Sequence, residues 1–119
     1  MAKNVDREGP IHLAILSYLR MQYPKAAIHA SPNANTMKGR DVARMIEKQK
    51  KMGMRPGWPD IEMILGGRFY AFEVKAEGNR QQPNQVDVGR DIGIAGGHYF
   101  VVRSTDDVKE AMSAVDRPR

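Results

Sequence analysis

Apolar residues recur every three or four positions in two stretches of the chain, as they do along one face of an amphipathic helix. The first stretch covers residues 10–23 and opens with a proline, which suits the first turn of a helix. The second runs from about residue 39 to 52, with apolar residues on one face and most basic residues elsewhere. Pro24 and Gly53 follow these stretches and are typical helix stops. The pattern therefore predicts two amphipathic helices.

Shorter apolar runs bounded by turn residues predict four strands. They cover residues 26–30, 60–65, 68–76 and 98–103. Gly66 and Gly67 separate the second and third runs, and a glycine pair suits the positive φ angles of a two-residue hairpin turn. We expect these two strands to form an antiparallel hairpin.

Capping residues and glycines predict two further helices. One covers residues 84–95, despite two internal glycines, and a second glycine pair stops it. The other covers residues 104–115, where Ser104 or Thr105 is a suitable N-cap and acidic residues occupy the first turn. The predicted order is α β α β β α β α, which indicates an α/β fold.

The composition indicates a single domain over residues 1–119, with a frayed tail over about residues 116–119. Hydrophobic residues make up 41% of the chain and charged residues 28%, as in soluble globular proteins. No apolar run approaches the roughly 18 residues of a membrane span, and the first residues do not resemble a signal peptide, so we expect a cytoplasmic protein. The absence of cysteine excludes thiol catalysis and zinc sites built on thiolates.

The basic charge of the chain is concentrated in one segment. The net charge is +5, and residues 38–55 account for all of it, with seven basic residues against Asp41 and Glu47 (7 − 2 = +5). The basic residues are Lys38, Arg40, Arg44, Lys48, Lys50, Lys51 and Arg55. A compact basic patch is typical of a surface that binds nucleic acid. A solvated, lysine-rich helix face is the alternative interpretation.

The hairpin register places two acidic residues opposite each other. With the turn at Gly66 and Gly67, opposing residues have numbers that sum to 133, so Asp60 faces Glu73. Their β-carbons would lie about 5 Å apart, which destabilises a sheet when both groups are charged. Side chains alternate along a strand, so Lys75 lies on the same face as Glu73. A lysine and two carboxylates thus converge at one end of the hairpin.

These three side chains fit a site for phosphodiester hydrolysis. Two carboxylates with space for water and phosphate oxygens form a typical Mg²⁺ or Mn²⁺ site, and a cation would offset their repulsion. Such a cation lowers the pKa of a water molecule, while Lys75 stabilises the negative charge that develops. The alternative is a surface salt bridge in which Lys75 only neutralises the two acids.

Pro59-Asp60 followed by Glu73-Val74-Lys75 resembles the signature of the PD-(D/E)XK nucleases, and most of the chain resembles the VRR-Nuc family of that superfamily. The family pattern has a glutamate at the start of the first helix, then G-x-P-D and E-V-K. A glutamine follows at the start of a helix that ends in Gly-Gly, and then an apolar strand. The matching residues here are Glu8, Gly57 to Asp60, Glu73 to Lys75, Gln85, Gly96-Gly97 and Tyr99 to Val102. No single motif is specific, but their order is.

The resemblance implies both a fold and a set of site residues. The fold is a restriction-endonuclease-like αβββαβ core, a mixed central sheet flanked by helices, with the basic helix inserted between the first two strands. Asp60 and Glu73 would be metal ligands together with the Val74 carbonyl, and Lys75 would be the catalytic lysine.

The resemblance assigns accessory catalytic roles to two further residues. Glu8 would reach the metal site from the first helix, although an acid in a first turn also fits a purely helix-stabilising role. Gln85 would line the site, or else be an exposed helix residue. Trp58 could stack on a base, but packing of its loop against the core is the simpler interpretation. Glu62 fits a solvent-facing strand position better than a third acid of the site.

Taken together, the residues and the resemblance predict a DNA endonuclease that uses Mg²⁺ or Mn²⁺. We expect phosphate contacts with little sequence preference from Lys38, Arg40, Arg44, Lys48, Lys51, Arg55, Arg68 and Arg80. Stand-alone members of the family resemble Holliday-junction resolvases, which implies branched DNA as substrate and a symmetric homodimer. A flap, nicking or restriction-type nuclease and a non-catalytic DNA-binding module are the alternatives.

Overall fold

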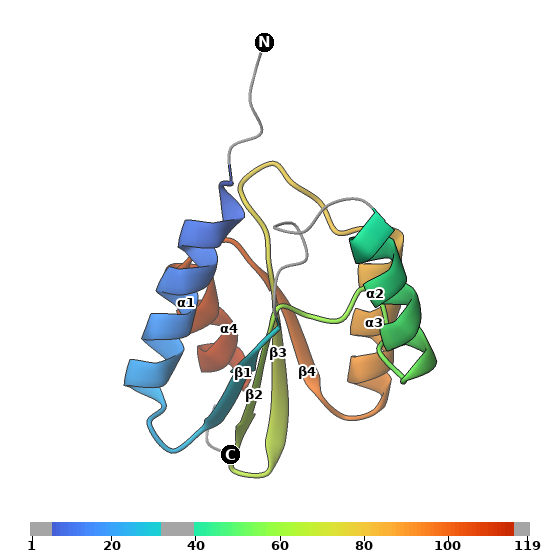
Figure 1. Ribbon diagram of the computed structural model, residues 1–119. Coiled ribbons are helices and arrows are strands. Elements are labelled where there is room, and N and C mark those ends of the chain that lie inside the picture. Colours follow the sequence, from blue (N-terminus) through green and yellow to red (C-terminus); the bar gives the residue numbers. More distant parts are fainter. Residues whose placement is uncertain (1–5, 32–39, 116–119) are drawn as a thin grey trace.

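A computed structural model describes residues 6–31 and 40–115 of the chain (Figure 1). Along these residues the predicted order of helices and strands is confirmed. The elements are α1 (Glu8–Gln22), β1 (Ala27–Ala30), α2 (Arg40–Lys51), β2 (Ile61–Leu65), β3 (Arg68–Val74), α3 (Pro83–Ile94), β4 (His98–Val102) and α4 (Thr105–Val115). None of the described helices is long and apolar enough to cross a membrane.

The four strands form one mixed sheet in the order β1-β2-β3-β4. β1 pairs with β2 and β2 with β3 in antiparallel fashion, whereas β3 and β4 are parallel because α3 connects them. Ile61 lies opposite Phe72, as the predicted hairpin register requires. Gly66 and Gly67 have φ angles of 59° and 78°, which fits a tight turn that side chains other than glycine rarely tolerate.

The main core lies between the sheet and the α1–α4 layer (Figure 1). Alternate residues of β3 point into it, and Tyr70, Phe72 and Val74 are each almost fully buried there. From the helices, Leu19 of α1 and Val108 of α4 pack against the same cluster. This packing fixes the direction of the intervening β3 residues, which must point to the opposite face of the sheet.

A smaller core lies on that opposite face, beneath α3. Ala71, Val88 and Ile92 are buried there, with Phe69 and Tyr99 packed against them. A β-carbon at Gly89 would lie 2.6 Å from the Tyr99 ring, so glycine lets α3 approach β4 closely. Because this core is short, it leaves the carboxyl end of β3 to polar side chains.

α2 packs loosely in comparison with the other helices. None of its described side chains is buried, although those of Val42, Met45 and Ile46 are partly covered. The segment after α2 is held by an ion pair from Arg55 Nη2 to Asp91 Oδ2 of α3, at 2.7 Å. Between β1 and β2, α2 is thus an addition to an α1-β1-β2-β3-α3-β4 core, as expected.

Candidate active site

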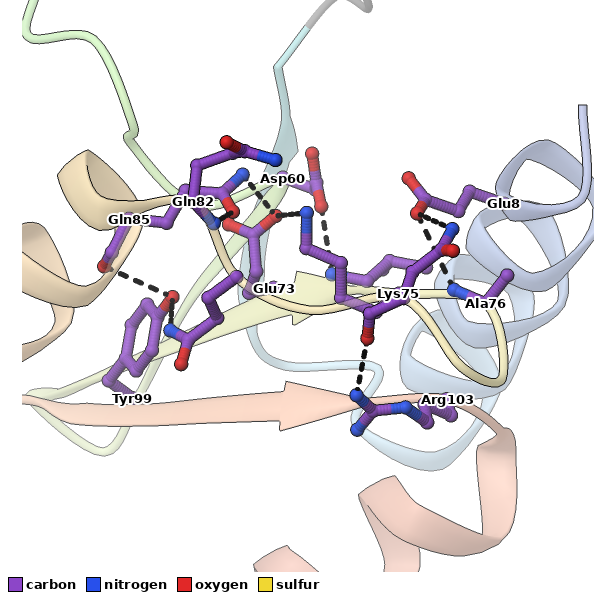
Figure 2. A network of polar contacts seen from close by, with 12 residues as sticks. Glu8, Asp60, Glu73, Lys75, Ala76, Gln82, Gln85, Tyr99 and Arg103 are labelled. Carbon is purple, nitrogen blue, oxygen red and sulfur yellow. Dashed lines mark hydrogen bonds and ion pairs between the residues drawn. The ribbon is translucent and has the colours of Figure 1, made fainter.

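The structure brings Asp60, Glu73 and Lys75 together at the carboxyl end of β3 (Figure 2). Asp60 directly precedes β2, and its Oδ2 accepts a hydrogen bond of 2.8 Å from the backbone N–H of Val74. This bond extends the hairpin ladder by one step and fixes the carboxylate beside Glu73. Lys75 follows β3, and its N–H donates to the Val102 carbonyl at 3.0 Å, which fixes its backbone against β4.

Glu73 and Lys75 form a buried ion pair. Lys75 Nζ lies 3.9 Å from Glu73 Oε2, and the two side chains are only 9% and 2% exposed, respectively. A surface salt bridge, the alternative interpretation of this group, is therefore wrong. Buried ionised side chains need close partners, because desolvation costs several kcal/mol per ion.

One oxygen of Glu73 has such partners and the other does not. Oε2 accepts a 3.0 Å hydrogen bond from Gln85 Nε2 and faces Lys75. Oε1 is buried and has no hydrogen-bond donor among the described residues. An unsatisfied buried oxygen is rare in folded proteins and indicates either a cost tolerated for function or a missing ligand.

The buried position of Glu73 shifts the pKa of its carboxyl group. Burial, followed by the nearby Asp60 carboxyl, raises its pKa from the ordinary 4.5 to about 8, and Lys75 opposes the rise. Without a cation, burial and the Asp60 carboxyl thus favour the protonated form of Glu73, whereas Lys75 favours the ionised form that pairs with it. A divalent cation between the two carboxylates would also favour the ionised form.

Gln85 is oriented by its place at the start of α3. Its Oε1 accepts the backbone N–H of Gln82 at 2.7 Å, as part of a capping box in which the Gln82 side chain accepts from the backbone at Gln85. The Gln85 amide group must then present its N–H₂ end to Glu73. Pro83 in the first turn fixes the backbone of this corner. Gln85 therefore contacts a proposed metal ligand, and it is not the freely exposed helix residue of the alternative interpretation.

Glu8 lies on the other side of the site, in the first turn of α1. Its Oε2 accepts hydrogen bonds from Asn79 Nδ2 at 3.1 Å and from the Ala76 N–H at 3.5 Å (Figure 2). Together with Asp60 and Val74 it lines a cleft of about 250 Å³. Glu8 is thus a first-turn acid that also lines the cleft beside Asp60, and its accessory role stays a prediction.

Side chains of the site can supply some of the ligands of a divalent cation, and the backbone can supply another. Among the described residues, no three histidine, aspartate or glutamate side chains are placed to hold a metal ion by themselves. Mg²⁺, however, is usually bound by one or two carboxylates with water and substrate oxygens completing the shell. Asp60 and Glu73 are close enough to interact electrostatically, and the unpartnered Glu73 Oε1 is a free ligand atom.

Asn79 joins three parts of the site, although no sequence pattern singled it out. Its side chain donates to Glu8 and accepts from Arg7 Nη2 at 3.3 Å, and its carbonyl accepts from Arg103 Nη2 at 2.7 Å. Asn79 therefore ties the loop after β3 to α1 and to the end of β4. No sequence signal distinguished it, since the stretch has only the composition of a loop.

Tyr99 is a second residue whose role was missed, because it was assigned only to an apolar strand. Its hydroxyl accepts from Gln81 Nε2 at 2.9 Å and donates to the Gln85 carbonyl at 3.4 Å. Burial and the nearby Glu73 raise its pKa to about 12, so it remains a neutral donor. Tyr99 thus supports the α3 corner that carries Gln85.

The predicted phosphate contacts differ in whether they are free on the surface or paired. Arg44, Lys48 and Lys51 are exposed on α2, and Arg80 is exposed on the loop that leads from β3 to α3. Arg55 is exposed but paired with Asp91. Lys38 and the side chain of Arg40 lie outside the described residues.

The structure places Arg68 at the end of β3 far from the site, which speaks against its predicted phosphate contact. Arg68 begins β3 at the hairpin turn, whereas Glu73 is near the other end of the strand. Five residues of extended chain separate them by about 17 Å. Arg68 is exposed but is not part of the site.

This chain is similar to known proteins in its structure. No family model and no curated protein matches the sequence. A solved structure described as a "VRR_NUC domain protein" matches with a TM-score of 0.70 and 21% identity, over 97% of this chain and 91% of that one. Another, described as a "VRR_NUC domain", matches with a TM-score of 0.60 and 20% identity, over 95% of this chain and all of that one. The expected restriction-endonuclease-like fold is confirmed.

Proposed function

From the VRR-Nuc fold of this chain, we propose that it is a metal-dependent nuclease of the PD-(D/E)XK type that hydrolyses phosphodiester bonds in DNA. The observation that carries the proposal is the buried Glu73 carboxylate, whose Oε1 has no partner among the described residues. It lies beside a second carboxylate and a buried lysine. A stabilising role alone does not account for such a group, because replacing buried ionic groups by apolar ones is often neutral or stabilising.

Asp60 and Glu73 are the residues that would hold the cation, with the Val74 carbonyl as a third ligand. In an extended strand the N–H and C=O of one residue point to the same edge. The Val74 N–H points to Asp60, which places its carbonyl on the side of the two carboxylates. When bound, Mg²⁺ or Mn²⁺ supplies neutralisation of a phosphate and activation of water.

Lys75 provides a fixed positive charge next to the reacting phosphate. Its ammonium is held near Glu73 and almost fully buried, so the surrounding protein screens it less than water would. In this position it can orient a water molecule and stabilise negative charge in the transition state. Glu8 and Gln85 act as accessory residues, Gln85 by holding the Glu73 carboxylate through its amide.

DNA would reach this site along the exposed basic residues of α2 and the adjoining loop. Arg44, Lys48, Lys51 and Arg80 are exposed and make phosphate contacts without reading bases. Selectivity then depends on DNA shape, and we propose branched DNA as the substrate and a symmetric homodimer as the active form. Light scattering coupled to gel filtration tests the dimer, and a monomer at micromolar concentration would contradict it.

The proposal is tested with end-labelled linear duplex, single-stranded, flap and four-way junction DNA in Mg²⁺, Mn²⁺ or chelator. Wild type is compared with Lys75→Met, which keeps the aliphatic chain of a buried side chain and removes its charge. We expect cleavage that disappears with chelator and with Lys75→Met. Symmetric cutting of the junction supports the resolvase assignment, and cutting of flaps or duplex supports another nuclease of this type. Binding without cleavage under every metal condition would overturn the proposal.

A further inference from the structure

Trp58 lies beside the candidate active site but has no role in the chemistry proposed above. Trp58 is 39% exposed and belongs to neither core cluster, so its ring is not held by the core packing that the sequence suggested. Instead, its Nε1 donates a 2.8 Å hydrogen bond to Glu62 Oε2. The other Glu62 oxygen, Oε1, lies 3.1 Å from His29 Nδ1. Glu62 of β2, itself bonded to His29 of β1, thus holds this exposed aromatic ring.

The backbone on both sides of Trp58 is also fixed. Gly57 has a φ of +87°, and a β-carbon there would lie 2.8 Å from the backbone of Asn84 at the start of α3. On the other side, Pro59 is buried. Because the loop is clamped against α3 and the indole is hydrogen-bonded, little conformational freedom remains for a ligand to remove.

The sheet register places this ring next to the proposed metal ligands. Glu62 lies opposite Ala71, so its diagonal neighbour on the same face is Glu73, at about 7–8 Å. Trp58 is two residues from Asp60 along the chain. An indole held by Glu62 is therefore within reach of a nucleotide whose phosphate occupies the site.

The surroundings of Trp58 favour a nucleobase over a phosphate. Glu62 carries negative charge, which repels a phosphate. On its far side Glu62 borders a hollow of about 180 Å³ whose lining includes the apolar residues Ala27, Ile64 and Phe69. Ile64 is 52% exposed there. An exposed aromatic side chain near exposed apolar residues is a surface on which bases stack.

We infer that Trp58 is a stacking platform for an unpaired base next to the scissile phosphate, and that Glu62 and His29 are positioning residues for its indole. The inference rests on the proposed function, which supplies the phosphate site. A base within a duplex is already stacked on both faces, so only an unpaired or flipped base can use the platform. The enzyme would therefore favour DNA that is single-stranded at the cut, such as a fork, a flap or a junction with unpaired bases at its branch point.

Trp58 is the only tryptophan of the chain, so intrinsic fluorescence reports on this ring alone. The experiment titrates wild type with a single-stranded thymidine oligonucleotide or a blunt, fully paired hairpin, in chelator to prevent cleavage. Anisotropy of end-labelled DNA measures binding independently. We expect the single strand to quench the fluorescence as it binds and the hairpin to bind with little change. Unchanged fluorescence at saturating single strand would overturn the inference.

Variants then separate stacking from loop structure. Trp58→Ala should weaken single-strand binding about tenfold, or about 1.4 kcal/mol, and hairpin binding less than about twofold. Trp58→Phe should retain most of the affinity. Ile94→Ala, which truncates an exposed side chain at the far end of α3, is the control. Equal losses on both DNA forms would contradict the inference.

A second pair of variants remains informative if Trp58→Ala does not fold. Glu62→Ala should release the indole and reduce the selectivity for single strands, and Glu62→Gln, which keeps an acceptor for Nε1, should restore it. The two proposals fail differently. If single strands quench the Trp58 fluorescence but no DNA is cleaved, only the nuclease proposal is contradicted. If DNA is cleaved in a metal-dependent way but the Trp58 fluorescence does not change, only the stacking platform is contradicted.

Discussion

Glu62 and Glu73 are diagonal neighbours on one sheet face, but their carboxylates have different surroundings. Stability alone would favour partners on both oxygens of the more buried acid, and the structure shows the reverse. Glu62 is 26% exposed, and both of its oxygens have protein partners, His29 and Trp58. Glu73 is only 2% exposed, and one of its oxygens has no partner among the described residues. The buried acid, which needs partners most, has both of them, Gln85 and Lys75, on a single oxygen. This difference supports the proposed roles of Glu73 as a ligand for a cation and of Glu62 as a positioning residue.

Matched amide substitutions should separate the two glutamates most strongly. Glu73→Gln removes a proposed metal ligand and should lower the cleavage rate more than about 100-fold, since even a residue that supports a ligand accounts for 10–100-fold. Glu62→Gln should lower it less than about threefold. Single-turnover cleavage of junction DNA in Mn²⁺ measures both. Similar losses in the two variants would show that the site does not depend on Glu73 as a ligand.

Gln85 offers a smaller test, because it acts on Glu73 indirectly. Gln85→Ala removes the 3.0 Å hydrogen bond to Glu73 Oε2 and should weaken the apparent affinity for Mn²⁺ about 10-fold or more. The maximal rate at saturating Mn²⁺ should change less. Gln49→Ala, at an exposed position of α2, is the matched control. A loss of rate that added Mn²⁺ does not recover would assign Gln85 a different role.

The hairpin is the part of the site that the sequence predicted well. A glycine pair at the turn fixes the register, and the register alone places Asp60 opposite Glu73. The same arithmetic separates Arg68 from the site and so also speaks against its predicted phosphate contact. α1 begins at Glu8, before the proline that was expected to start it, and Asp6 Oδ1 accepts the Gly9 N–H in its first turn.

The surroundings of the carboxylates could not be predicted in the same way. The burial of Glu73 and Lys75 depends on α3 and on the loop after β3, which are held by contacts distant in sequence. Asn79 bonds to Glu8 across 71 positions of the chain, and no local pattern signals such a contact. Likewise, the exposure of Trp58 follows from its bond to Glu62 and not from its hydrophobicity.

The raised pKa of Glu73 predicts a stability that depends on pH. In chelator the folded chain holds a proton on Glu73 up to a pH of about 8, whereas the unfolded chain releases it near 4.5. Between these values the folded state binds more protons, so its stability falls as pH rises. We expect the melting temperature to drop by about 4 °C or more between pH 6 and pH 9, which corresponds to roughly 1 kcal/mol.

Substitution and metal sharpen this pH test. Glu73→Gln has no proton to lose and should flatten the profile, whereas Glu62→Gln should leave it as in wild type. Saturating Mn²⁺ should raise the melting temperature of wild type more at pH 8 than at pH 6, because protons then compete less for the carboxylate. Circular dichroism measures all three proteins. A profile for Glu73→Gln that still falls steeply would locate the titrating group elsewhere.

The smallest expected effect concerns exposed basic residues that contact neither Glu62 nor Glu73. Lys48→Ala removes an exposed cation from α2 and should reduce the slope of log K against log salt for duplex binding by about 0.9. Arg68→Ala removes an equally exposed cation at the far end of β3 and should leave the slope unchanged. Anisotropy titrations at several salt concentrations, in chelator, compare the two. Because neither residue contacts Glu62 or Glu73, both variants should keep the wild-type preference for single strands. Equal slopes in the two variants would mean that DNA does not follow α2 to the site.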